Sequence, residues 1–513
     1  MKTMSSPATT APKAGGEATM PVSGPRKTFK TRHLSMMALG SAIGAGFFLG
    51  TGVAVSEAGP AVLVSYVLAA LIAVSVMFAL SELASSLPST GSFSTYAEVG
   101  IGRWAGFTSG WLYWAMLVMV LGLEITGAAA IFVSWFPSVP QWVVALAIVV
   151  VLGGVNLMAA RDFGEVEAWL AGIKVLAIIV FLLIGIGLVT GIVPGRTESI
   201  GQTILGHGGF APTGLAGIAV ALLAIITSFG GIEIVTIAAG EAENAKVAIS
   251  AAIRSVISRI LIFYVGSVIL LICLLRWDSK EMSTSPFAAV LNMAGIPAVG
   301  VIMEAVVFVA LVSAFSANIY ASSRIAYSLS ARGMGMKWLL GRGVSSLKMN
   351  EAGHASSTTS ATFVADEEAE SLQDRVATEG ASGDIAEGRT PRRAVSVSIF
   401  FALVSVALNW LLPESLLGIL LNSVGMVLLV IWVFILVAQI RLHPKLEAEG
   451  SIALRSPGWP WLPRLVIASL VLVACLMAWN PEARQQLIAM SVLTLIIIAI
   501  YFIREAMAQR SAK

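Results

Sequence analysis

Long apolar runs separated by short polar segments dominate the pattern of this chain. Twelve of these runs are long enough to cross about 30 Å of hydrocarbon as helices, some of them with tilt. They predict spans near residues 34–55, 61–86, 106–134, 141–160, 167–191, 216–240, 255–275, 297–322, 394–412, 416–440, 463–479 and 486–503. We therefore expect an all-α membrane protein with twelve transmembrane helices.

Basic residues are distributed unevenly between the two sides of this predicted membrane. With the N-terminus placed in the cytoplasm, 27 of the 32 Lys and Arg residues lie on the inner side, four on the outer side, and Lys174 within a span. An excess of inner positive charge is typical of multi-pass proteins and predicts that both termini are cytoplasmic. The net charge of +3 therefore reflects topology and does not indicate nucleic-acid binding.

Composition supports the same fold class and divides the chain. Apolar residues make up 57% of the 513 residues and charged residues 12%, as is typical of polytopic membrane proteins in contact with lipid. Residues 1–30 predict a disordered cytoplasmic tail, and residues 343–391 predict a disordered cytoplasmic linker, either a passive spacer or a regulatory segment. The other divisions are 31–342 for spans 1–8, 392–505 for spans 9–12 and 506–513 for a cytoplasmic C-tail.

Glycines weaken two spans near their centres. Gly40, Gly44 and Gly46 fall within seven residues of span 1, at the depth where a lost backbone hydrogen bond is most costly. Gly230 and Gly231 form a second such point in span 6. Interruptions in spans 1 and 6 fit two inverted halves of five spans each, followed by two added spans. The alternative is close helix packing through small residues.

Interrupted helices expose peptide groups that can bind a small zwitterion. The outer half of span 1 is expected to begin near Ala45 and Gly46, where helical N–H groups suit a carboxylate, and Ser41 adds a hydroxyl donor. The outer half of span 6 is expected to end near Ser228 and Phe229, where free carbonyls suit an ammonium. The Phe229 ring either gates the ligand or simply packs. These features predict a binding site for a small amino acid.

Four ionisable residues are predicted at membrane depth. Lys174 in span 5 either exchanges a proton during transport or extends to the membrane interface. Glu124 in span 3 either relays a proton or anchors an interrupted helix. Glu233 either bonds the unwound backbone of span 1 or lines the pocket and meets a cationic group. Glu82, near the inner end of span 2, is expected to make a polar contact on the cytoplasmic side.

No pattern of catalytic or metal-binding residues is found. The four histidines lie away from the middle of the spans, so a His-ligated metal site or a catalytic triad within the membrane is not expected. Cys273 and Cys475 fall in apolar spans and indicate neither a disulfide framework nor a metal cluster. We therefore expect a transporter with no cofactor and no metal, whose partners are an amino acid, protons and membrane lipid.

Several motifs together resemble one known family. They are GSAIGAG at 40–46, EAGPA at 57–61, GSFSTYA at 91–97, GRWAG at 102–106, GWLYW at 110–114, Gly164-Glu165 with Lys174, and GEAEN at 240–244. Over about residues 30–505 the chain resembles the amino acid transporter family of the amino acid–polyamine–organocation superfamily. The resemblance implies a leucine-transporter-type 5+5 inverted repeat with broken helices 1 and 6. It also implies proton-coupled uptake of an amino acid.

The resemblance further implies roles for single residues. The substrate carboxylate would bind amides near Ala45 and Gly46, the amine would bind backbone carbonyls, and Lys174 would couple protonation to transport. From the residues and the resemblance together, the predicted substrate-binding residues are Ser41, Ile43, Gly44, Ala45, Gly46, Phe229, Gly230, Ile232 and Glu233, and the predicted proton-coupling residues are Lys174 and Glu124.

The resemblance extends to a substrate group. Residues 233–239 and 262–264 look most like bacterial γ-aminobutyrate permeases, which implies import of γ-aminobutyrate across the cytoplasmic membrane by proton symport. The family's usual second Gly is Ser41 here, its usual Thr is Ala45, and its Asn-Ser pair in span 8 is Ser316-Ala317. These departures leave other neutral amino acids open. An amino acid exchanger and a membrane nutrient sensor are the alternatives, and the sequence does not predict an oligomeric state.

Overall fold

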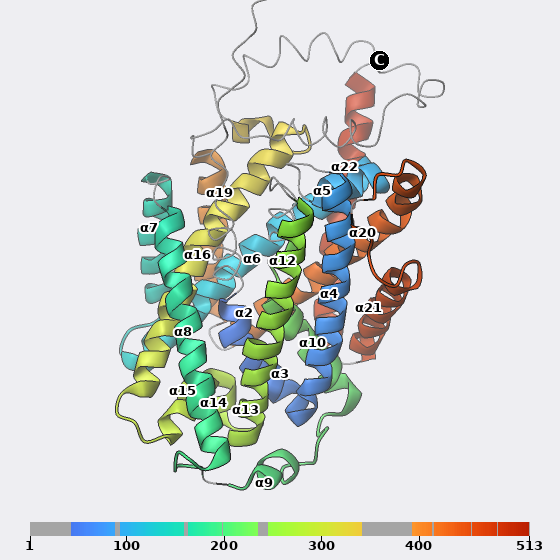
Figure 1. Ribbon diagram of the computed structural model, residues 1–513. Helices are drawn as coiled ribbons and strands as arrows, with labels where there is room; N and C mark the ends of the chain where they lie inside the picture. Colours follow the sequence, from blue (N-terminus) through green and yellow to red (C-terminus); the bar gives the residue numbers. More distant parts are fainter. Residues whose placement is uncertain are drawn as a thin grey trace, which may run out of the picture.

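All regular elements in the described part of the chain are helices, as the computed structural model in Figure 1 shows. The structure describes residues 43–87, 93–158, 163–196, 198–233, 245–340, 392–412, 415–452, 454–479 and 481–511. The predicted tail at 1–30 and linker at 343–391 lie outside these ranges. "Inner" and "outer" below follow the topology predicted from the basic residues.

The helices in the first half of the sequence include those at predicted spans 1–6. In chain order they are α2 (Ala45–Phe48), α3 (Gly50–Ala58), the 3-10 turn η1 (Gly59–Ala61), α4 (Val62–Ser86), α5 (Phe93–Gly100), α6 (Arg103–Trp135), α7 (Gln141–Met158), α8 (Phe163–Thr190), α9 (Ile200–Leu205) and α10 (Gly214–Phe229). The described part of the second half comprises α12 (Ala245–Arg259), the π-helix η2 (Ile260–Val265), α13 (Gly266–Leu274), α14 (Lys280–Thr284), α15 (Pro286–Met293), α16 (Val299–Ala331), η3 (Lys337–Leu340), α19 (Arg392–Leu411), α20 (Leu416–Ala448), α21 (Trp461–Trp479) and α22 (Pro481–Ser511).

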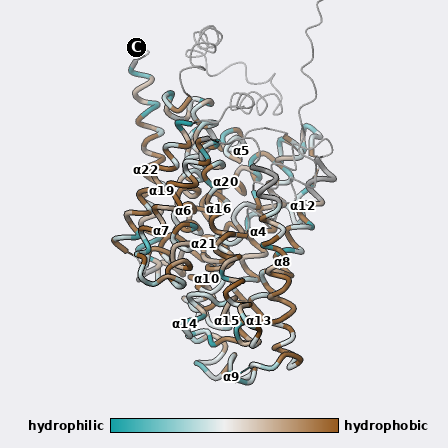
Figure 2. The backbone as a smooth tube through the Cα atoms, turned by 90° about the vertical axis from the view of Figure 1, so that its left-hand side faces the viewer, coloured by the Kyte–Doolittle hydropathy of each residue, from teal (hydrophilic) through white to brown (hydrophobic). Residues whose placement is uncertain are grey.

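Nine described helical segments are long and apolar enough to cross a membrane. Two shorter apolar helices, Gln141–Leu157 and Gly214–Phe229, coincide with predicted spans 4 and 6. One of the nine, Ala45–Ser86, covers parts of two predicted spans. Within it, Gly59 at φ 61° marks the boundary between α3 and α4. Figure 2 shows hydrophobic residues along the long helices and hydrophilic residues gathered toward both ends. The all-helical membrane fold is confirmed for the described chain, and the count of twelve stays a prediction.

Short helices cover both ends of the long ones. In Figure 1, α9, α14 and α15 lie at the outer end, opposite α5 and the last turns of α22. The sequence analysis did not predict them, because five to eight residues are too few for a span and carry mixed polarity. Helices α16 and α20 continue beyond the ends of the predicted spans, as far as Ala331 and Ala448.

Helix α6 occupies the interior, packed against α16, α20 and α5. A polar network fixes its position. Asn409 Nδ2 donates to Thr126 Oγ1 over 2.9 Å, and Gln141 Nε2 donates to Asn409 Oδ1 over 3.0 Å. These bonds join α6 to α7 and α19 inside the apolar layer, where hydrogen bonds between helices hold them in register. The network lies within one turn of Glu124, so it also fixes that carboxylate.

The polar contact predicted for Glu82 is present at the inner end of α4. One carboxylate oxygen lies 2.7 Å from His443 Nδ1, and the other accepts the N–H of Ser456 over 2.7 Å. His443 stacks on Trp459, with ring centroids 3.8 Å apart. Because Glu82 and His443 are both fully buried, this contact joins α4 to α20 and to the connection that follows α20.

Close packing of α10 on α20 gives a test of the fold. A Cβ on Gly425 would lie 2.4 Å from the Leu223 carbonyl oxygen, which belongs to rigid backbone. We expect Gly425→Ala to destabilise the protein by about 1–3 kcal/mol through overpacking. Gly418→Ala, in the same helix with nothing within 4 Å of the new Cβ, is the control. Thermal unfolding in detergent measures both, and equal midpoints would contradict this packing.

Candidate functional site

Helix α2 begins close to the start predicted for the outer half of span 1. Gly44 is extended, with φ −135° and ψ −151°, and α2 begins at the next residue, Ala45. Ile43, Gly44 and Ala45 are buried, and Gly46 is partly exposed. The described chain begins at Ile43, so Ser41 and the expected inner half of this span lie outside it. The start of the outer half therefore agrees with the sequence.

The second interruption follows α10. That helix ends at Phe229, and Gly230 then turns the chain with φ −53° and ψ 143°. Gly231 has φ 97°, a conformation that glycine adopts without the steric penalty of a side chain. Ile232 and Glu233 follow, each 1% exposed, and residues 234–244 lie outside the described chain. The predicted end of the outer half at Phe229 is thus observed.

The two interruptions lie against each other. The Ser228 hydroxyl on α10 donates to the Gly46 carbonyl on α2. A Cβ on Gly46 would lie only 3.0 Å from Ser228 Cα, so the two backbones approach closely because residue 46 is glycine. Peptide groups from two helix ends are therefore gathered at one buried place.

Glu124 occupies the beginning of α2. The Ala45 N–H lies 3.3 Å from one Glu124 carboxylate oxygen and 3.2 Å from the other. The carboxylate is 4% exposed and comes from the middle of α6. The sequence analysis expected a ligand carboxylate at this amide, and here the protein's own carboxylate lies on it. The contact is that of an anchor for the interrupted helix, one of the two roles expected for Glu124.

Tyr264 caps the other helix end. Its hydroxyl donates to the Ser228 carbonyl over 3.0 Å, and its ring lies 4.7 Å from that of Phe47 and 5.3 Å from that of Phe229. Phe229 also packs against Tyr66, with centroids 6.3 Å apart. Tyr264 belongs to the π-helical η2, a distortion that often marks functional positions and that hydropathy does not reveal.

Glu233 bonds the backbone of its own interruption. Its Oε1 accepts the Gly231 N–H over 3.2 Å. Its Oε2 and the Tyr113 hydroxyl are buried, and neither has a hydrogen-bond partner among the described residues. The Tyr113 phenol interacts electrostatically with this carboxylate. Two buried polar groups therefore adjoin the second interruption. The part of span 1 that Glu233 was predicted to contact includes residues that the structure does not describe.

Lys174 is buried between α8 and α16. It is 1% exposed, and its Nζ lies 3.4 Å from Ser313 Oγ. This position excludes the alternative in which the side chain extends to the membrane interface. A buried amine in the apolar layer, next to a helix that packs on α6, suits a group that gains and loses a proton.

Two further charged residues were missed by the sequence analysis. Arg259, counted there among the inner basic residues, is 5% exposed and lies at the end of α12 beside η2. Glu304 lies in α16, where its carboxylate accepts from Trp135 and Ser285. Both fall within predicted apolar spans, which is the same signal that identified Glu124 and Lys174.

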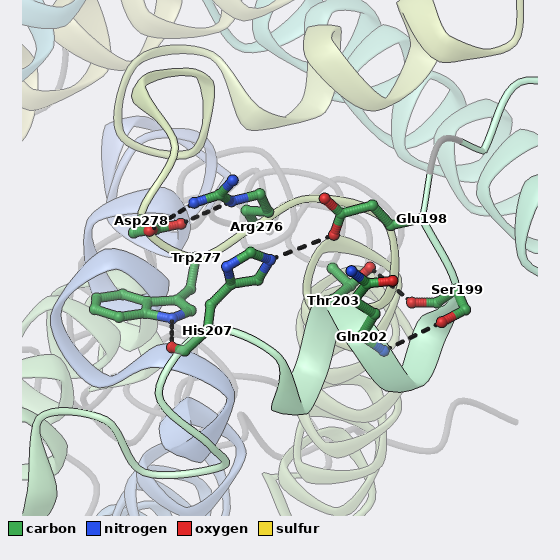
Figure 3. Close-up of polar contacts among 8 residues, drawn as sticks. All are labelled: Glu198, Ser199, Gln202, Thr203, His207, Arg276, Trp277 and Asp278. Atoms are coloured by element: carbon green, nitrogen blue, oxygen red, sulfur yellow. Dashed lines mark hydrogen bonds and ion pairs between the residues drawn. The ribbon is translucent and has the colours of Figure 1, made fainter.

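Polar contacts close the outer end around α9, as Figure 3 shows. The Trp277 indole donates to the His207 carbonyl over 2.8 Å, and His207 Nε2 lies 3.4 Å from Glu198. The Arg276 guanidinium, which donates to both oxygens of Asp278, holds the pKa of that carboxyl below its usual value. These contacts join the connection before α10 to the one after α13, apart from the interrupted helices.

Comparison with known proteins decides the family. The sequence profile described as "Amino acid permease" matches residues 33–341 and 372–513. The chain belongs to the amino acid permease family. It is 42% identical over 479 residues to the aromatic amino acid transport protein AroP of Corynebacterium glutamicum, covering 92% of this chain and 94% of that protein.

Other relatives of this permease are named for other amino acids. It is 36% identical over 471 residues to the γ-aminobutyric acid permease of Escherichia coli, covering 91% of this chain and 92% of that protein. It is 32% identical over 487 residues to the L-asparagine permease of Salmonella typhimurium, with 93% and 89% covered. The predicted family is confirmed, and with it a multi-pass membrane transporter that is not an enzyme. Membership implies the leucine-transporter-type fold, while the relatives divide between substrates.

The contact of Glu124 with the start of α2 can be tested by a double-mutant cycle. A Cβ on Gly44 would lie 2.5 Å from Glu124 Oε1, so Gly44→Ala must displace the carboxylate. We expect this change to lower the free energy of unfolding by about 1–3 kcal/mol in the wild-type background. In a Glu124→Ala background the same change should lower the free energy of unfolding much less, because the clash with the carboxylate is absent. Equal costs in both backgrounds, measured by thermal unfolding, would contradict the contact.

Proposed function

We propose that this permease imports a neutral amino acid together with a proton across the cytoplasmic membrane, with both termini in the cytoplasm. The observation that carries the proposal is the meeting of two helix ends at Gly46 and Ser228 within the apolar layer. A protein that only spans lipid gains nothing from interrupted helices, because each freed peptide group must be satisfied again. A binding site for a zwitterion uses those groups.

The zwitterion is expected to replace contacts that the protein makes with itself. Its carboxylate binds the amides of Ala45 and Gly46, with Ser41 as an additional donor. Gly44 and Gly230 keep the space free of side chains. Its amine binds main-chain carbonyls, for which the proposed positions are Ile43, Phe229 and Ile232, beside Glu233.

Glu124 provides the link between binding and protonation in this proposal. The Glu124 carboxylate lies on the Ala45 amide, so a substrate carboxylate competes with it for the same donor. Two carboxylates at one site repel, and protonation of Glu124 removes the repulsion and weakens its hydrogen bond with the amide. Substrate and proton then favour each other's binding, which is the requirement for symport.

Lys174 is the second proposed proton-coupling residue. It is buried at the contact of α8 with α16, and its charge is costly there unless an acceptor faces it. Protonation and deprotonation would therefore change how tightly α8 and α16 are held together. A residue of this kind can couple the proton gradient to the movement of helices.

Two substrate groups are supported by specific observations. An aromatic amino acid is favoured by the 42% identity to a protein named for aromatic amino acid transport. It is also favoured by the rings of Phe47, Tyr66, Phe229 and Tyr264 around the interruptions. γ-Aminobutyrate is the second candidate, supported by the likeness of residues 233–239 and by 36% identity to a permease named for it.

Uptake into proteoliposomes tests this function directly. We expect accumulation of labelled phenylalanine, tyrosine, tryptophan or γ-aminobutyrate when an inward proton gradient is imposed, and a competition panel ranks them. Uptake that ignores the gradient and requires internal amino acid would indicate an exchanger. Binding without any uptake would indicate a sensor, and neither binding nor uptake of any amino acid would refute the proposal.

Removing the buried amine should separate binding from coupling. We expect Lys174→Ala to lose gradient-driven accumulation, so that internal substrate only equilibrates with the outside, while substrate binding is retained. Ser313→Ala is the matched control, because it removes the 3.4 Å contact of Lys174 and leaves the amine. Accumulation by Lys174→Ala at the wild-type level would remove this residue from the mechanism.

Filling the second interruption should abolish binding. A Cβ on Gly230 would already lie 3.2 Å from the Thr227 carbonyl and 3.3 Å from Leu428, so the larger side chain of Gly230→Leu must enter the site. The same substitution at Gly172, an exposed residue of α8 with nothing within 4 Å, is the control for folding and insertion. Normal affinity of Gly230→Leu in an equilibrium binding assay would place the substrate elsewhere.

A further inference from the structure

A carboxylate lies on the outer side of the interrupted first helix. Glu304 belongs to the second turn of α16, and its two oxygens accept from different elements. Trp135 Nε1, at the end of α6, donates over 2.7 Å, and Ser285 Oγ, just before α15, donates over 3.2 Å. Both donors are neutral, so they solvate the negative charge without balancing it.

This carboxylate differs from the other acidic groups near the ends of the helices. Glu98 pairs with Arg332, Glu82 with His443, and Asp278 with Arg276. Within the described part of the chain, no ion pair involves Glu304. A carboxylate that accepts only from neutral donors and has no ion pair among the described residues is a candidate for binding a mobile cation.

A small cavity adjoins the Glu304 carboxylate. Its volume is about 10 Å³, and it is lined by Phe48 and Leu49 of the first interrupted segment, by Phe287 of α15 and by Glu304. A space of this size holds one group as large as a water molecule, which is also the size of an ammonium head. Phe48 lies only three residues beyond Ala45, so the cavity lies one helical turn outside the proposed carboxylate site.

We propose that Glu304 is an outer recognition site for the ammonium group of the arriving amino acid. The inference rests on the proposed function and deepens it. The ammonium takes over the Glu304 oxygens from Ser285 and Trp135 and supplies the missing positive charge. The substrate is thereby selected for a free amine before it reaches the interrupted helices, and acids that lack an amine gain nothing from this site.

A purely structural role makes a different prediction. If Glu304 only ties α15 to α6, then removing either donor should have the same effect as removing the charge. Trp135→Phe and Ser285→Ala each abolish one donor and leave the carboxylate. Glu304→Gln keeps a hydrogen-bonding side chain of the same shape and abolishes the charge, whereas Glu304→Asp keeps the charge.

Transport kinetics of the full-length protein in proteoliposomes provide the first readout. We expect Glu304→Gln to raise KM for the transported amino acid about tenfold with little change in kcat, as for the loss of one charge-assisted contact in initial binding. Glu304→Asp, Trp135→Phe and Ser285→Ala should stay close to the wild-type KM. Glu281→Gln removes a carboxylate from the neighbouring outer helix α14 and controls for the general surface potential.

Thermal stabilisation by butylammonium provides the second readout, which does not require transport. We expect butylammonium to stabilise the wild-type protein and Glu281→Gln, and not Glu304→Gln. Equal stabilisation of Glu304→Gln, or none of the wild type, would overturn the inference, as would an unchanged KM in Glu304→Gln. A rise in KM of equal size in Ser285→Ala and Trp135→Phe would show a structural tie instead. Absence of any amino acid uptake by the wild type would count against the proposed function alone.

Discussion

A peptide group that loses its helical partner inside a membrane must find another, and this requirement shapes the centre of the permease. The Ala45 N–H donates to the Glu124 carboxylate, the Gly46 carbonyl accepts from the Ser228 hydroxyl, and the Ser228 carbonyl accepts from the Tyr264 hydroxyl. These three peptide groups at the helix ends are each satisfied by a side chain. Under the proposed function, a substrate enters by replacing some of these hydrogen bonds with its own. Such an exchange keeps affinity moderate, and a carrier that must release its cargo needs moderate affinity.

The groups that satisfy the interruptions are not equally free to move. Glu124 projects from α6, whose position is fixed by Thr126, Asn409 and Gln141 across three helices. Ser228 and Tyr264 lie on α10 and η2, beside residues with non-helical or π-helical backbone. The backbone that carries Glu124 is thus held by three helices, whereas the groups that contact it lie at helix ends.

The sequence predicted the helical segments well because apolar length is a direct consequence of bilayer thickness. It also located the start of α2 and the end of α10, since Gly44, Gly230 and Gly231 are costly in a transmembrane helix unless they are used. What it could not supply was which side chain meets which peptide group. That Glu124 rather than a solute lies on Ala45 depends on how α6 crosses α2, and no local pattern encodes a crossing.

Other features escaped prediction for identifiable reasons. The π-helix around Tyr264 has the same apolar composition as an α-helix and differs only in hydrogen-bond register. Glu304 and Arg259 were visible as charges in apolar spans, but their significance depends on partners far away in the chain, such as Trp135. The short helices at the outer end follow from tertiary packing, in which Gly52 of α3 lies against Met282 and Pro286.

The buried contact of Glu82 with His443 and Ser456 limits how the inner end of the molecule can move. If α4 and α20 parted there, the buried Glu82 carboxylate would lose its contact with His443 and be left with fewer donors. The two helices are therefore expected to travel as one rigid body, carrying the connection to α21 with them. A passage toward the inner side must then form between other helices of the bundle.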